Sequence, residues 1–339
     1  MGGPDPAVAA CRVAVRRALA DLRAQQPGTL VVACSGGADS LALLAACVFE
    51  ARARDADPGW RVVGATVDHG LQEGSAEQAQ RVLAQMEALG VDETFSARVR
   101  VNAAGQGPEA AAREARYAVL GEIAARTQAA AVLLGHTLDD QAETVLLGLG
   151  RGSGGRSIAG MRRELVRDGT RYLRPLLDVR RGATEAACRA QGLDFWVDPH
   201  NSDPRFLRAR VRHDVLPVLE RELGPGVTET LARTADSLRA DMEALDELTD
   251  AALAAPGALE VASLAALPVA LRRRVLRAAA VRAGALDGEL FAAHVLALDE
   301  LVTRWRGQRW VDLPGHLRAL RREGRIEFEH AVGPGSARG

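Results

Sequence analysis

The sequence predicts an α/β fold, a doubly wound and mostly parallel sheet, followed by a smaller and mainly helical C-terminal domain. Short apolar runs alternate with helical patterns over roughly the first 150 residues, which is typical of parallel strands joined by crossover helices. Three polar motifs, SGGADS, VDHG and GHTLDD, each follow one of these apolar runs. Ligands of such sheets bind beyond the carboxyl ends of the strands, so the three motifs are expected at one site.

Apolar periodicity and capping residues place the individual elements. The expected strands are 30–33, 60–67, 93–101 and 129–134, and the expected helices are 5–24, 41–49, 75–89 and 108–125, with a further helix up to Leu149 that Asp139 or Asp140 caps. Further helices are expected at 182–191, 227–254, 264–283 and 290–305. The stretch 206–219 is expected to be helical as far as Pro217. Strands are expected at 308–313 and 316–328. These elements predict a catalytic domain over 1–220, a helical linker over 221–255, a small domain over 256–330 and a disordered tail over 331–339.

Composition excludes several classes of protein. The hydrophobic content of 47% and the charged content of 26% are those of a globular protein. No apolar run reaches the roughly 18 residues of a membrane span, and no secretory signal opens the chain, so we expect no membrane contact and a cytoplasmic location. Four cysteines form no CxxC pair, which indicates neither a zinc site nor a disulfide framework.

The positive charge consists entirely of arginine. The net charge is −1 and no lysine occurs among the 43 basic residues, which excludes Schiff-base and Walker-type lysine chemistry. Arginines outnumber acids by 13 to 9 over 162–221 and by 12 to 7 over 260–325. These two regions could form a basic tract for a large anion such as RNA, although solvated helix faces explain the charge equally well.

The stretch that follows the first predicted strand has the composition of a phosphate-binding loop. Two adjacent glycines allow a close backbone approach to an anion, and the next helix presents its positive end there. A carboxylate at Asp39 is out of place beside a phosphate unless a Mg²⁺ lies between them, so the loop indicates a nucleotide with a metal ion. The alternative is an ordinary strand-to-helix turn.

Carboxylates and histidines follow two other predicted strands. Asp139 and Asp140 could converge with Asp39 on one Mg²⁺, although a plain helix cap explains Asp139 as well. On the next turn, Glu143 is expected on an exposed face. A histidine follows each strand, His69 and His136, and either could contact a nucleotide or be merely solvated.

Arginines supply the remaining candidates. Arg113 could stabilise pyrophosphate or a transition-state charge, or could pair on the helix surface with Glu109 four residues earlier. Arg208, Arg210 and Arg212 alternate before a helix, and each could contact phosphate or form an ion pair within the protein.

Together the motifs resemble a known family. Ser35-Gly36-Gly37-Ala38-Asp39-Ser40 resembles the SGGxDS loop of the PP-loop ATP pyrophosphatases, which have the adenine nucleotide alpha hydrolase-like fold. Within that superfamily, the motifs VDHGL, EAAAREARY, GHTLDDQAET, RGSG, DPHN and RARVRHDVLP resemble the tRNA(Ile)-lysidine synthetases in order and spacing over roughly 28–220. The LPGHLRALR stretch weakly resembles their tRNA-binding domain. Thr137, Ala209 and His200 stand where the family usually has histidine, asparagine and serine.

The resemblance implies a two-step reaction. ATP with Mg²⁺ would adenylate the C2 oxygen of the wobble cytidine in the CAU anticodon of tRNA(Ile), and the ε-amine of free L-lysine would then attack C2 and displace AMP to give lysidine. It implies ATP contacts for the loop, namely Ser35, Gly36, Gly37, Ala38, Asp39 and Ser40, and for His69 and His136. Catalysis would rest on Asp39, Arg113 and Asp139, metal binding on Asp39, Asp139 and Asp140, and tRNA binding on Arg208, Arg210 and Arg212.

Three rival functions remain at this stage, and assembly as a homodimer is left open. A PP-loop tRNA thiolase would be expected to use cysteines, and this chain has no CxxC pair. An amidotransferase-type synthetase would need an ammonia source that the sequence does not show. A non-catalytic RNA- or nucleotide-binding protein would not need Asp39, Arg113 and Asp139 together.

Overall fold

The computed structural model describes residues 3–23, 28–52, 59–68, 74–99, 108–152 and 154–331. The chain forms two compact units, Met1–Leu238 and Arg239–Gly339. The division falls within one helix, α10 (Val227–Ala254), whereas the sequence suggested a separate linker over 221–255. The division into a catalytic domain, a linker and a small domain stays a prediction.

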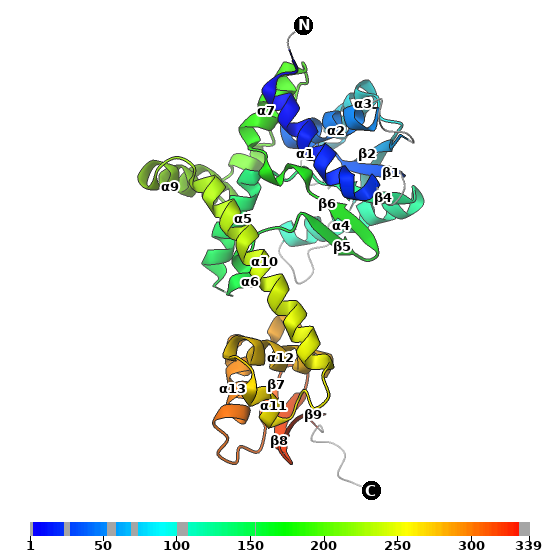
Figure 1. Cartoon of the computed structure of the whole chain (residues 1–339). Helices are drawn as coiled ribbons and strands as arrows, with labels where there is room; N and C mark the ends of the chain where they lie inside the picture. Colours follow the sequence, from blue (N-terminus) through cyan, green and yellow to red (C-terminus); the bar gives the residue numbers. More distant parts are fainter. Residues whose placement is uncertain are drawn as a thin grey trace. The chain divides into compact units, whose positions relative to one another are not determined.

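A six-stranded sheet forms the centre of the first unit (Figure 1), and its strand order is β3-β2-β1-β4-β6-β5. The strands are β1 (Thr29–Ala33), β2 (Arg61–Asp68), β3 (Glu93–Arg98), β4 (Ala129–Leu133), β5 (Glu164–Arg167) and β6 (Thr170–Leu173). All neighbours pair in parallel except β5, which is antiparallel to β6. The predicted doubly wound, mostly parallel fold is confirmed. The chain reverses its direction across the sheet between β1 and β4, which is where such folds bind ligands.

Both faces of the sheet are buried at β1. Successive side chains of a strand point to opposite faces, and those of β1 are buried on each. Leu30 and Val32 of β1 belong to the core that includes helices α1 and α2, whereas Val31 belongs to a second core with Tyr117 and Leu120 of α4. All three β1 side chains are fully buried. A continuous apolar run therefore signals a central strand here, as it does in other parallel sheets.

The helices of the first unit follow the predicted order. They are α1 (Pro6–Arg23), α2 (Ala38–Ala51), α3 (Ser75–Leu89), α4 (Pro108–Arg126), α5 (Leu138–Arg151), α6 (Gly155–Ile158), α7 (Arg181–Ala190), α8 (Leu207–Arg210) and α9 (Leu216–Leu223), with shorter 3₁₀ turns between some of them. The prediction that a helix ends at Pro217 was wrong. A π-helical turn over Val211–Val215 leads into α9, so Pro217 lies in a first turn, where its missing N–H costs little.

The β5–β6 hairpin was not predicted from the sequence. Each strand has four residues, and the side chains of β5 alternate between exposed and partly buried, with the apolar Val166 among the exposed ones. Asp168 occupies the left-handed region with φ 49° and Gly169 follows with φ 77°, which is the backbone that a tight two-residue hairpin turn requires.

The second unit combines three helices with a small antiparallel sheet. Its elements after α10 are α11 (Val261–Ala266), α12 (Val269–Arg282), a 3₁₀ turn (Asp287–Glu289), α13 (Ala292–Thr303), β7 (Val311–Leu313), β8 (Leu317–Arg322) and β9 (Arg325–His330). The strands pair in the order β7-β8-β9. The turn expected at Pro314-Gly315 is present, with Gly315 at φ 83°. The expected single strand over 316–328 is instead two, because Glu323 and Gly324 form a second turn with positive φ.

Among the described residues, no helix combines the length and the apolar character that a membrane crossing requires.

Candidate active site

The glycine loop between β1 and α2 leaves no room for a larger residue at its first glycine. Gly36 has φ 81°, and a Cβ there would lie 2.6 Å from Cγ2 of Val82. The Ser40 hydroxyl accepts from the Ser35 N–H at 3.1 Å and donates to the Gly37 carbonyl at 2.9 Å. The first N–H groups of α2 have no acceptor within the helix. The loop therefore presents backbone donors and a positive helix end to an anion.

Asp39 lies in the first turn of α2, at the junction of two strand ends. A Cβ at Gly135, just beyond β4, would lie 3.1 Å from the Asp39 backbone. Its carboxylate contacts the Thr184 hydroxyl and lies 3.5 Å from Nε of Arg181. Burial raises the pKa of Asp39 to about 6 and the charge of Asp140 adds to the rise, whereas Thr184 and Arg181 oppose it. Asp39 is thus a partly buried carboxylate that Arg181 neutralises only from 3.5 Å.

Helix α5 begins with a capping box that differs from the prediction. Thr137, not Asp139 or Asp140, is the N-cap. The Asp140 carboxylate accepts from the Thr137 N–H at 2.8 Å and from the Thr137 hydroxyl at 2.9 Å. Thr137, which stands where the family usually has histidine, is fully buried and serves as this N-cap. It starts the helix that carries the acidic cluster.

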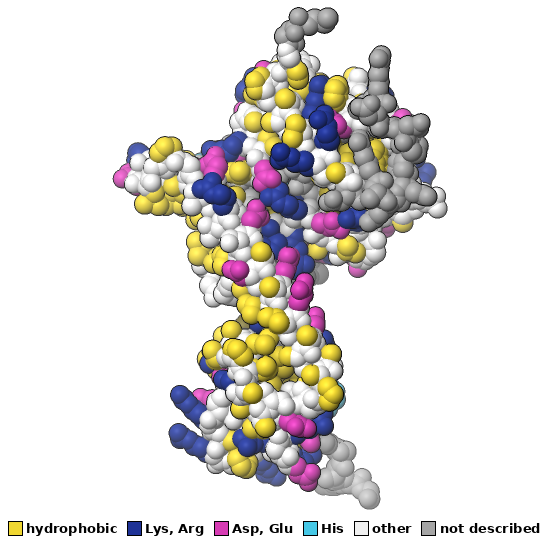
Figure 2. Space-filling view, viewed as in Figure 1, with side chains coloured by type: hydrophobic (Ala, Val, Ile, Leu, Met, Phe, Trp, Pro, Cys, Tyr) yellow, Lys and Arg dark blue, Asp and Glu magenta, His cyan; other side chains and the backbone are white. Residues whose placement is uncertain are grey.

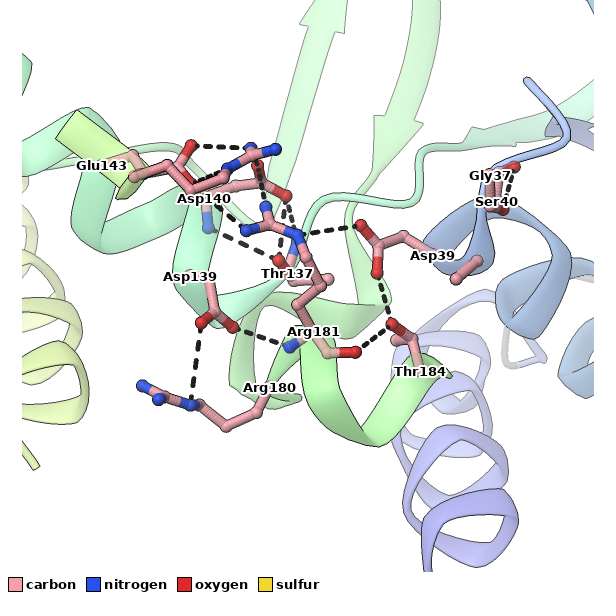
Figure 3. Close-up of polar contacts among 12 residues, drawn as sticks. Gly37, Asp39, Ser40, Thr137, Asp139, Asp140, Glu143, Arg180, Arg181 and Thr184 are labelled. Carbon is pink, nitrogen blue, oxygen red and sulfur yellow. Dashed lines mark hydrogen bonds and ion pairs between the residues drawn. The ribbon is translucent and has the colours of Figure 1, made fainter. Parts of the chain in front are cut away.

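Arg181, at the start of α7, joins the three carboxylates that the sequence analysis expected to converge (Figure 3). Its Nη2 lies 2.8 Å from Asp140, and its Nε lies 3.5 Å from Asp39. Its backbone N–H donates to Asp139 at 2.7 Å. Burial alone would raise the pKa of Asp140, but Arg181 and Arg208 hold it near 2. One guanidinium therefore occupies the space between Asp39 and Asp140.

Glu143 is the most deeply buried acid of this cluster, which contradicts its expected position on an exposed face. Its side chain is 0% exposed and contacts three guanidinium groups. Arg208 and Arg212 each approach it at 2.7 Å, and Arg181 at 3.3 Å. Among the two alternatives for Arg208 and Arg212, the structure supports ion pairing within the protein. Arg210 differs, because it donates to the backbone carbonyl of Pro204 at 2.7 Å.

His136 lies beside this cluster as a neutral imidazole. Burial lowers its pKa to about 3, Asp140 opposes that change, and Arg174, Arg116 and Arg208 reinforce it. Its Nδ1 is buried and has no hydrogen-bond partner among the described residues. A buried ring nitrogen without a partner is costly, and a bound substrate would remove that cost. His69, the other predicted histidine, lies outside the described residues.

Helix α4 presents two arginines of different character. Arg113 is exposed, and its guanidinium lies 5.5 Å from the ring centroid of Tyr117. Arg116 lies on the site side of the helix, where burial lowers its pKa and the charges of Arg113, Arg174 and Arg208 lower it further. Among the described residues, Arg116 has no ion pair. An arginine surrounded by other cations is suited to an anionic ligand.

A cavity adjoins the acidic cluster on the side of α9 and α10. Its volume is about 160 Å³. Acids, arginines and two apolar residues share its lining, which comprises Asp139, Glu143, Arg180, Arg181, Arg212, Leu216, Pro217, Glu220 and Thr228. The Arg180 Nη1 makes no hydrogen bond among the described residues, but it lies 3.8 Å from Glu220 and 3.5 Å from Glu229. The cavity therefore offers charges of both signs within one small space.

The carboxylates of this cluster could hold a metal ion only together with the phosphate oxygens of a bound nucleotide. Among the described residues, no group of three or more histidine, cysteine or acidic side chains could hold a metal. Mg²⁺, however, is usually held by one or two carboxylates together with phosphate oxygens and waters. Asp39 and Asp140 already flank one cationic group, that of Arg181. These carboxylates therefore fit a Mg²⁺ that arrives with a nucleotide.

The cysteines near the loop have no chemical role that the structure supports. All four are free and buried. The Cys188 thiol donates to the Ala38 carbonyl at 3.3 Å, and burial raises the pKa of Cys188 to about 12. Cys34 lies 3.8 Å from the Ser40 hydroxyl. Such thiols stay protonated and pack as small apolar groups.

The structure thus brings together the loop, Asp39, Asp139 and Asp140, but leaves Arg113 outside the carboxylate cluster. Sequence reasoning missed Arg181, Thr184 and Glu143. No local signal could have found Arg181, since it is one of 43 arginines and its partners lie about 40 residues or more away.

Two domains of known families match most of this chain. Residues 11–219 match the PP-loop domain, and residues 259–326 match the TilS substrate binding domain. The chain is 57% identical to the tRNA(Ile)-lysidine synthase of Thermobifida fusca, covering 96% of this chain and 98% of that protein. It is 52% identical to the enzyme of that name from Salinispora tropica, covering 99% of each. A U34-tRNA thiolase from Methanococcus maripaludis, at 16% identity and a TM-score of 0.57, covers 68% of this chain and 79% of its own and shows the shared fold alone.

Proposed function

Because the chain belongs to the tRNA(Ile)-lysidine synthase family of PP-loop proteins, we propose that it joins L-lysine to C2 of the wobble cytidine in tRNA(Ile). The single observation that carries this proposal is identity of more than 50% to such enzymes over nearly the whole chain. The enzyme is a ligase that uses ATP and modifies tRNA.

In the first half-reaction, O2 of the cytidine attacks the α-phosphorus of ATP and diphosphate leaves. The loop Ser35–Ser40 would hold the phosphates through backbone N–H groups at the start of α2. Arg116 would supply a further positive charge to the nucleotide or the activated tRNA, a role that the sequence analysis gave to Arg113. The neutral His136 would offer its unpaired ring nitrogen to the substrate.

Asp39, with Asp140 or Asp139, would hold Mg²⁺ together with the phosphates of the nucleotide. When bound, the ion neutralises the charge that develops on the departing diphosphate. Arg181 is the side chain that must yield, because its guanidinium already contacts Asp39 and Asp140. We expect it to keep Asp140 and Glu143 and to release Asp39.

In the second half-reaction, the ε-amine of lysine attacks C2, the C2–O bond breaks and AMP leaves with the oxygen. We place the lysine in the cavity of about 160 Å³. Asp139 and Glu220 would hold its amines, and Arg180 would hold its carboxylate. This arrangement would bring an amine to the edge of the acidic cluster.

The rival thiolase function lacks support in the chain. Its cysteines are buried, and burial raises the pKa of Cys188 to about 12. A cytoplasmic location and a homodimer stay predictions.

The decisive experiment incubates the protein with ATP, Mg²⁺, labelled lysine and a tRNA that carries a CAU anticodon. We expect label in the tRNA and one AMP released per lysine joined. Release of AMP supported by a sulfur donor or by ammonia, with no label in the tRNA, would overturn the proposal.

Substitution of Asp39 separates catalysis from folding. We expect Asp39→Asn to lower AMP formation by about 100-fold or more, as loss of one group that stabilises transition-state charge commonly does. Filter binding should show nearly unchanged affinity for tRNA. Equal loss of AMP formation and tRNA binding would mean that Asp39 acts only as a structural residue.

A further inference from the structure

The second unit carries a tryptophan- and arginine-rich connection between α13 and β7, residues 304–310, with the sequence RWRGQRW. Three arginines and two tryptophans fall within these seven residues. Figure 2 shows dark blue side chains projecting from this unit near the orange chain that follows α13 in Figure 1. We call residues 304–310 the tryptophan loop.

Ion pairing divides the arginines of this unit into two groups. Those of α12 each pair with a carboxylate: Arg272 and Arg273 with Asp299, Arg274 with Asp246, Arg277 with Asp287 and Arg282 with Asp250. Within the described parts of the chain, Arg304, Arg306 and Arg309 of the tryptophan loop pair with no carboxylate. The net positive charge of 260–325 is therefore concentrated at the loop rather than spread over the helices.

The two tryptophans lie beside arginines and not in a core. Trp305 is 47% exposed, and the Arg321 guanidinium lies 4.8 Å from its ring centroid. Trp310 has two such neighbours, Arg309 at 4.7 Å and Arg318 at 4.3 Å. An exposed indole held beside cations presents a flat apolar surface at low conformational cost.

Resting on the proposed function, we propose that the tryptophan loop is a docking surface for the tRNA substrate. Arg304, Arg306 and Arg309 contact backbone phosphates, and the Trp305 ring stacks on an unpaired base. Unpaired arginines beside exposed aromatic rings are the combination that proteins use for single-stranded nucleic acid.

The test measures affinity of the full chain for the CAU tRNA at several salt concentrations, without ATP or lysine. We expect Trp305→Ala to weaken binding by about 5- to 100-fold, the range for loss of one stacked base. Trp305→Phe should restore most of the affinity. The double change Arg306→Gln and Arg309→Gln should lower the slope of log K against log[salt] by about 1.4 to 1.8, since two phosphate contacts are lost.

Two matched controls lie in the same unit. Phe291 is another exposed aromatic residue, at 64% exposure, and Arg282 is an exposed arginine that pairs with Asp250. Phe291→Ala and Arg282→Gln should leave the affinity and the salt slope as in the parent protein. Melting curves of all variants should coincide, because none of the changed side chains is in the core. Trp305→Ala binding tRNA no more weakly than Phe291→Ala would overturn the proposal.

The outcomes also distinguish this surface from the reaction itself. Lysidine formation by the parent protein together with unchanged binding by Trp305→Ala would refute the surface and leave the function standing. Binding that depends on Trp305, with no lysine incorporated by the parent protein, would refute the function and retain an RNA surface. In steady-state assays Trp305→Ala should raise KM for tRNA and leave kcat unchanged.

Discussion

The acidic cluster of the first unit and the tryptophan loop of the second use the same side chain for different purposes. Around Glu143, Arg208 and Arg212 are partly buried and each lies 2.7 Å from the carboxylate. In the tryptophan loop, Arg306 and Arg309 are exposed and, among the described residues, lack acidic partners. The comparison shows that arginine content alone does not locate an RNA surface. We expect the pairing state of each guanidinium to locate it.

Glu143→Gln is expected to have the largest effect, because it removes the acid that the partly buried guanidinium groups share. The change leaves three guanidinium groups around a neutral amide, and removal of one member of a buried ion pair commonly costs about 3–5 kcal/mol. We expect a loss of that size in the free energy of unfolding, measured by chemical denaturation. Glu327→Gln, which breaks the exposed pair with Arg322, should cost less than about 1 kcal/mol. Similar losses for both variants would show that burial does not set the cost of breaking an ion pair in this protein.

Arg116 tests whether an unpaired guanidinium marks an anion site within the first unit as well. We expect Arg116→Gln to lower kcat/KM for AMP formation by about 10- to 100-fold, the loss of one charge-assisted contact to a phosphate. The matched variant is Arg113→Gln, three residues away on the exposed side of α4, with an expected effect below about 5-fold. A larger loss for Arg113 than for Arg116 would restore the role that the sequence suggested.

His136 provides a smaller effect that depends on pH. Burial chiefly lowers its pKa from the ordinary value of 6.5 to about 3, so the folded state holds it neutral while the unfolded state binds a proton below pH 6.5. Stability is therefore complete above pH 6.5 and falls as the pH decreases from 6.5 towards 3. Between pH 7 and pH 5 we expect a loss of about 1–2 kcal/mol from this group. His136→Asn should reduce that loss in urea titrations, and an unchanged pH dependence would contradict the assignment.

The parts of the fold that the sequence predicted are those with local signals. β1 is an uninterrupted apolar run, and the glycine loop follows it directly, so both were identified. The β5–β6 hairpin was not predicted because both strands are short and β5 is partly exposed. Pro217 suggested a helix end, but a π-helical turn before it places the proline in a first turn.

The site residues that were predicted from the sequence also have a local signal. Asp39, Asp139 and Asp140 were identified because each follows a predicted strand. Glu143 was assigned to the surface because nothing within its own helix shows that Arg208 and Arg212 cover it. Thr184 and Arg181 contact Asp39 from a helix about 140 residues further along the chain. Such contacts arise from packing, which periodicity and spacing do not encode.

The guanidinium cluster around Glu143 has a chemical consequence for an enzyme that activates a base for attack by an amine. An arginine side chain stays protonated at neutral pH, so none of these cations has a free electron pair to offer as a nucleophile. No lysine side chain exists in this protein to compete for the activated cytidine. The catalytic unit thus offers no side-chain amine to its own activated base, and an added alkylamine used as a chemical trap would report the substrate pocket without a background from side-chain amines.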